Sequence, residues 1–157
     1  MFRPDHFDWT CVNILLGDGD AYSTDVALAF EKAAKKVGID VCTKASYNAG
    51  SVAVEDKRPM KAPIEKIMGN SCCLVTVLIA QTKDISSLLL EAHRQKYPGE
   101  WIMSENTLSS LDGIIADLKQ HNMTDDSIQK LLRGLFEFTE IIEILRACKF
   151  KYSFCIL

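Results

Sequence analysis

The chain has 157 residues, of which 48% are hydrophobic and 25% are charged, so it is long enough for one globular domain and short for two. Its 18 basic and 21 acidic residues give a formal net charge of -3, without the basic surface that a nucleic-acid backbone or an anionic membrane attracts. We therefore expect a single domain over residues 1–157 and no nucleic-acid partner.

A strand, a tight loop and a helix come first. The apolar run 11–16 is bounded by GDGD, as expected of a strand buried on both faces. Apolar residues then recur at helical spacing up to residue 37, and Gly38 ends the helix. Ser23 or Thr24 is the predicted N-cap of this helix.

The same alternation continues along the chain. Runs 39–45, 72–80 and 100–103 are predicted strands, and 62–68 and 82–97 are predicted helices. Such alternation predicts an α/β fold of three layers, αβα, with a mainly parallel sheet and right-handed crossovers.

The remaining third, 107–157, is less regular. A helix is expected over 108–120, followed by a polar connection, 121–129, that caps a short turn or helix. Residues 133–138 alternate like an edge strand, although a helix stays open, and the tail begins as an amphipathic helix.

Ligands of parallel α/β sheets lie at the carboxyl ends of the strands, which here are 17–23, 46–48, 81–82 and 104–106. The first of these holds GDGDAYSTD. A phosphate cradle is disfavoured because a third glycine and a lysine are lacking, and a calcium loop is disfavoured because Tyr22 interrupts it and its closing position is Ala29. Asp18 and Asp20 are interpreted as a solvated turn.

Other chemistry has no anchor in the sequence. The histidines lack metal-ligand spacing and no serine lies in a nucleophile elbow, so we expect no catalytic residue, no metal and no cofactor. The cysteines have mostly apolar neighbours, which favours buried thiols over disulfides while leaving some pairing open. They are Cys11, Cys42, Cys72, Cys73, Cys148 and Cys155.

A ligand-contact set does emerge at the strand ends. Tyr22 offers a ring with a polar tip, and Ser23 offers a hydroxyl and an amide at a helix N-terminus, which suits a small carboxylate. Glu105 offers a carboxylate for an ammonium, and Gln81 ends the central strand. Together they suit an amino-acid-like ligand. The alternative is that Tyr22 packs on its loop and Glu105 caps a turn.

Several phrases resemble one family. They are Phe7, Trp9 and Val12, the acidic-x-Tyr turn Asp20 and Tyr22, the helix and strand 30–41, and the ending Trp101, Ser104 and Glu105. Over 7–106 the chain is similar to the second lobe of the receptor family ligand-binding region, which has the type I periplasmic-binding-protein fold. Beyond 106 the resemblance weakens, although Arg133 and Gly134 match a returning strand.

The resemblance implies a non-catalytic sensor. In amino-acid-binding members the residues that match Tyr22 and Glu105 contact the ligand, but Ser23 replaces the usual glycine and Glu105 the usual aspartate. It also implies a missing first lobe, a membrane-borne effector, a possible homodimer and an extracellular or periplasmic location. We expect the chain to be a fragment of such a receptor, since no residue in it supplies the first lobe's share of the site. Neither a signal nor a transmembrane segment can be read in it.

Two alternatives stay open. One is a flavodoxin-like protein-interaction domain without a small-molecule ligand, which would use its aromatic tail as a docking edge. The other is an enzyme with a nucleotide cofactor.

Overall fold

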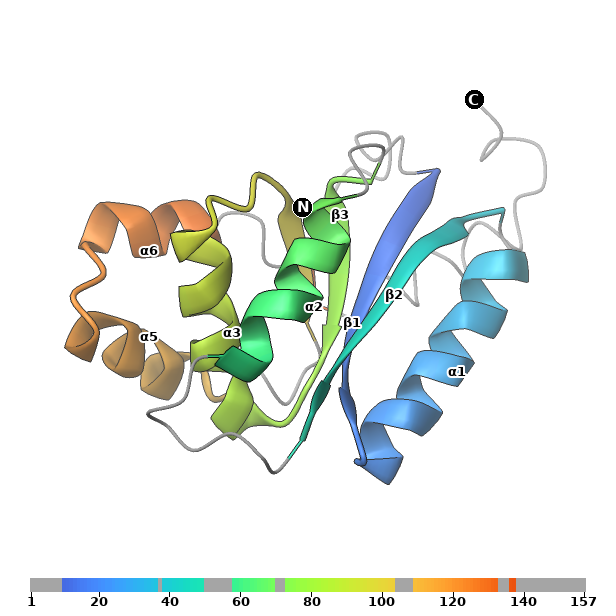
Figure 1. Cartoon of the computed structure of the whole chain (residues 1–157), viewed down its shortest axis with the longest axis horizontal. Coiled ribbons are helices and arrows are strands. Elements are labelled where there is room, and N and C mark those ends of the chain that lie inside the picture. Colours follow the sequence, from blue (N-terminus) through green and yellow to red (C-terminus); the bar gives the residue numbers. More distant parts are fainter. Residues whose placement is uncertain are drawn as a thin grey trace.

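The computed structural model describes residues 10–36, 38–49, 58–69, 73–103, 109–132 and 136–137. Strands and helices alternate along the chain, as the apolar runs and amphipathic segments predict (Figure 1). The elements are β1 (Cys11–Asp18), α1 (Ala21–Lys36), β2 (Asp40–Asn48), α2 (Arg58–Met68), β3 (Val75–Ile79), α3 (Thr82–Arg94), β4 (Glu100–Met103), α5 (Leu111–Gln120), α6 (Asp125–Leu132) and β5 (Phe136–Glu137).

The strands form one sheet in the order β2-β1-β3-β4-β5, and each neighbouring pair is parallel. β1 and β3 lie inside the sheet. All five residues of β3 are buried and β1 is buried along most of its length, as strands covered on both faces must be. The predicted parallel sheet is confirmed.

Helices cover the two faces of this sheet (Figure 1). α1 packs Phe30 and Ala34 against Ile14 and other side chains on one face. α2 and α3 pack on the opposite face, in a core that continues into α5 and α6. The fold is therefore the predicted three-layer αβα arrangement.

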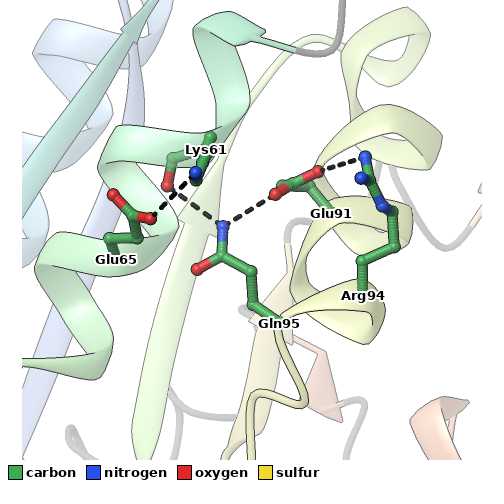
Figure 2. Close-up of polar contacts among 5 residues, drawn as sticks. All are labelled: Lys61, Glu65, Glu91, Arg94 and Gln95. Carbon is green, nitrogen blue, oxygen red and sulfur yellow. Dashed lines mark hydrogen bonds and ion pairs between the residues drawn. The ribbon is translucent and has the colours of Figure 1, made fainter.

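A polar network joins α2 to α3 at the surface of the second helical layer (Figure 2). The Gln95 side-chain amide donates to the Lys61 carbonyl at 3.2 Å and to a Glu91 carboxylate oxygen at 2.8 Å. Glu91 also accepts from Arg94 at 3.1 Å, and Lys61 pairs with Glu65 at 3.6 Å. Glu91, which is buried, is thus held by two donors from its own helix end, one of which bridges to α2.

A tight turn leads into β4. The Tyr97 hydroxyl lies 2.6 Å from the Thr76 hydroxyl, and the Tyr97 ring packs on Trp101 with centroids 4.8 Å apart. The Glu100 amide donates to the Leu74 carbonyl at 2.7 Å and begins the pairing of β4 with β3. Gly99 lies in this turn, where a side chain would have to fit between the two strands.

In the less regular third of the chain, the structure decides two predictions that the sequence left open, one for 121–129 and one for 133–138. The polar connection after α5 contains helix α6, whose start is capped by the Thr124 hydroxyl accepting from the Ser127 amide at 3.2 Å. Phe136–Glu137 pairs with β4, so part of 133–138 is a strand. The tail, 138–157, lies outside the described residues. Among the helices described, none is long and apolar enough to cross a bilayer.

The cysteine prediction was wrong for the residues that can be compared. Cys11 and Cys73 form a disulfide between the starts of neighbouring strands, with Cα atoms 5.8 Å apart. Cys42 is a thiol on the exposed side of β2. Apolar neighbours in the sequence favoured burial, but the parallel sheet brings strand starts together, and this contact could not be read locally. Cys72, Cys148 and Cys155 lie outside the described residues.

Candidate functional site

The turn from β1 into α1 lies at the edge of the sheet formed by the carboxyl ends of the strands. Gly19 has a φ of +84°, and this left-handed step aims Asp20 back at the helix start. Asp20 accepts the Ser23 hydroxyl at 2.7 Å and the Ser23 amide at 3.3 Å. Asp20 is therefore the N-cap of α1, and the prediction of Ser23 or Thr24 as the cap was wrong. Asp20 lies three residues before Ser23, and its carboxylate accepts the amide hydrogen of Ser23 that a cap must satisfy.

The charge of Asp20 follows from these contacts. The hydrogen bond from the Ser23 hydroxyl lowers the pKa of the Asp20 carboxyl, and the Ser23 and Tyr22 amides act in the same direction. The carboxylate is thus ionised at neutral pH. It occupies the position at the helix N-terminus where we expected a ligand carboxylate, so that position suits a positive rather than a negative group.

Two exposed residues, Tyr22 and Gln81, lie at the same ends of the strands as Asp20. Tyr22, in the first turn of α1, is 50% exposed and is among the few large apolar side chains left open to solvent. Gln81, the residue before α3, is exposed, and its side chain also lowers the pKa of the Asp20 carboxyl. Residues after β1 and after β3 thus meet at one carboxylate.

Beneath this surface lies a buried pair. The Tyr47 hydroxyl, at the end of β2, donates to the Asp84 carboxylate in the first turn of α3 at 2.9 Å. Both residues are buried. Burial, and then the hydrogen bond to Asp84, raise the pKa of Tyr47 well above its usual value, so the hydroxyl stays protonated and remains a donor. A side chain on Gly17 would come within 3.0 Å of this hydroxyl, which explains the glycine.

We expect Tyr47→Phe to destabilise the protein by about 1–3 kcal/mol, because a buried carboxylate loses its donor while the ring stays in place. Chemical denaturation of the wild type and the variant measures the change. The matched control is Tyr97→Phe, which removes a hydroxyl whose partner, Thr76, is neutral. We expect about 1 kcal/mol for the control. Equal losses in the two variants would contradict a special role for the buried carboxylate.

The sequence-predicted site residues come together in part. Tyr22, Ser23 and Gln81 lie at one edge, around the ends of β1 and β3. Ser23 itself is fully buried and is engaged with Asp20, whereas Tyr22 and Gln81 face solvent. Glu105 lies outside the described residues.

Sequence reasoning missed the roles of Asp20, Tyr47 and Asp84. Asp20 was interpreted as a solvated turn, although its place three residues before a serine is the spacing of a cap. Tyr47 falls within the strand end 46–48 that the predicted topology singled out. Its partner is 37 residues away, and no local pattern signals that contact.

A protein-family model, described as the receptor family ligand binding region, matches residues 4–145 of the chain. The chain belongs to this family. No curated protein matches the chain. As a member of the receptor family ligand binding region, the chain is a ligand-binding receptor domain, and the edge that holds Asp20 and Tyr22 is the strand-end position at which α/β sheets bind ligands.

Proposed function

We propose that this chain is a non-catalytic, ligand-sensing lobe of a receptor ectodomain, and that it binds the ammonium group of a small, amino-acid-like ligand at Asp20, Tyr22 and Gln81. Family membership supports the receptor role. The observation that carries the choice of ligand group is the ionised Asp20 carboxylate, two residues before the exposed aromatic side chain of Tyr22.

The chemistry of the three side chains favours a cation. An ammonium can donate to Asp20 in a charge-assisted hydrogen bond, and it can also lie over the face of the Tyr22 ring. Gln81 supplies an amide oxygen as a further acceptor. Ser23 acts indirectly in this arrangement, because its hydroxyl holds Asp20 in place.

Glu105 stays part of the proposal through the family resemblance. It follows β4, the strand next to β3, and would add a second acid at the same edge of the sheet. The ligand's own carboxylate would then need a partner elsewhere, which the opposing lobe of a two-lobe receptor would provide.

The receptor setting is also proposed. The lobe would close on its ligand against a first lobe and pass that closure to a membrane-borne effector. It would work on the extracellular or periplasmic face of the membrane, and the proposal includes a homodimer. One feature supports export: Asn122 and Thr124 of the sequon Asn122-Met123-Thr124 are both exposed, as N-glycosylation requires.

A calorimetric titration tests the site. Glycine and glutamate are titrated into the chain, next to acetate and glutarate, which lack the amine. We expect heat of binding only for the amino acids. Asp20→Asn should lower their affinity about 10- to 100-fold, because asparagine keeps the helix cap and removes the charge. Tyr22→Ala should lower it about 2- to 30-fold.

The matched control is Asp18→Asn, which removes an equal charge from the same turn. Asp18 accepts from the Gly19 amide at 3.0 Å and is exposed. We expect its affinity to stay within about twofold of the wild type. The site assignment fails if Asp20→Asn and Asp18→Asn weaken binding equally. If the amine-free acids bind as tightly as the amino acids, the ammonium proposal itself fails.

A further inference from the structure

Three cysteine sulfurs meet at the end of the sheet opposite the ligand edge. Cys11 begins β1, Cys42 lies near the start of β2, and Cys73 precedes β3 by two residues. Their Sγ atoms all lie within 4.8 Å of one another. Because the strands are parallel and neighbouring, their amino ends bring the three residues to one point.

A β-bulge places Cys42 there. Val12 pairs with Val41 and Asn13 pairs with Thr43, so Cys42 is the extra residue of β2. Bulges commonly redirect a side chain at the rim of a sheet. Cys73 is buried, Cys11 is half-buried and Cys42 is exposed, so the cluster is closed on one side and open to solvent on the other.

We infer that these three cysteines form a binding site for one soft metal ion of the zinc type when the Cys11–Cys73 disulfide is reduced. Thiolates bound at about 2.3 Å from a single ion lie about 3.8–4.0 Å apart, so side-chain rotations alone would bring these sulfurs to that spacing. The open side at Cys42 leaves room for water as a fourth ligand.

A dithiol can reduce the Cys11–Cys73 disulfide. The dithiol gives two electrons and two protons to the disulfide and becomes a cyclic disulfide itself, leaving thiols at Cys11 and Cys73. The metal ion then displaces one proton from each of the three thiols. Oxidation of Cys11 and Cys73 removes two of the three ligands, so the disulfide form is the metal-free form of the site. Thiolates select soft ions, and Mg²⁺ and Ca²⁺ should not compete.

Cadmium is a suitable probe because thiolate-to-cadmium charge transfer absorbs in the ultraviolet. The chain is reduced with a dithiol, freed of it without air, and titrated with Cd²⁺, and then with Zn²⁺ against a chromophoric chelator. We expect one ion per reduced chain and none per oxidised chain. Cys42→Ser keeps Cys11 and Cys73 but removes one metal ligand. It should weaken binding more than about 100-fold, because changes to residues that only support the ligands already cost about 10- to 100-fold.

The remaining cysteines provide matched controls. Cys72→Ser, next to Cys73 in the sequence, and the double variant Cys148→Ser/Cys155→Ser should bind as the wild type does. Circular dichroism follows folding in each state. The inference is overturned if the folded, reduced chain binds no ion, if Cys42→Ser binds equally well, or if reduction unfolds the chain and the ion does not restore it.

Discussion

Gly99→Ala should destabilise the protein by about 3 kcal/mol or more, at the upper end of the cost of overpacking. A Cβ atom at this position would lie 2.3 Å from the Leu74 carbonyl oxygen and equally close to the Tyr97 hydroxyl. The carbonyl is backbone and accepts the Glu100 amide at 2.7 Å, so it cannot yield without breaking the first link between β3 and β4. Tyr97 is itself held by Thr76 and by Trp101.

Gly113→Ala is the matched control. Gly113 lies in α5, and a Cβ atom there meets nothing within 4 Å. Alanine should stabilise the helix by about 0.5–1 kcal/mol, because it loses less backbone entropy than glycine. Urea denaturation measures both variants. A stable Gly99→Ala protein would contradict the close approach of the two strands, whatever the control does.

Removal of the Cys11–Cys73 disulfide should lower the free energy of unfolding by an amount comparable to that of Gly99→Ala. Cys11 and Cys73 are 62 residues apart, and closing a loop of this length restricts the unfolded chain by about 4 kcal/mol at 25 °C in the chain-entropy model. We therefore expect the oxidised double variant Cys11→Ser/Cys73→Ser to lose about this much free energy of unfolding. The double variant is needed because a single change would leave one cysteine able to pair with Cys42.

Cys42→Ser is the control for this measurement, because Cys42 takes no part in the disulfide. Its free energy of unfolding should stay within about 0.5 kcal/mol of the wild type when both are oxidised, as for most exposed positions. Thermal or chemical unfolding under oxidising conditions is the measurement. If the double variant and the control are equally stable, the disulfide makes no contribution of the kind expected from loop length.

The layered fold was predictable because its signals are local. The apolar run that forms β3 is buried throughout, and such a run followed by an amphipathic helix is typical of a parallel α/β unit. The strand ends then follow from topology, which is why the sequence alone predicts that Tyr22 and Gln81 lie at the carboxyl ends of neighbouring strands.

The contacts that join the elements were not predictable in the same way. Tyr47 meets Asp84 across 37 residues, and Cys11 meets Cys73 across 62. Sequence alone cannot fix disulfide connectivity, and a buried tyrosine has no motif for its acceptor. Asp20 was misread for a different reason: Ser23, Thr24 and Asp20 are all good caps by type, and only the turn at Gly19 decides among them.

The bulge at Cys42 fixes the parity of β2. Val41 packs on the α1 side of the sheet and Ala45 on the α2 side, although residues four apart in a regular strand share a face. One supernumerary residue therefore decides that Tyr47, two residues after Ala45, points toward Asp84. Replacing the side chain at position 42 should change this arrangement little, but deleting one residue there would invert the strand from that point on. The number of residues in β2 therefore matters more for this arrangement than the side chain at position 42.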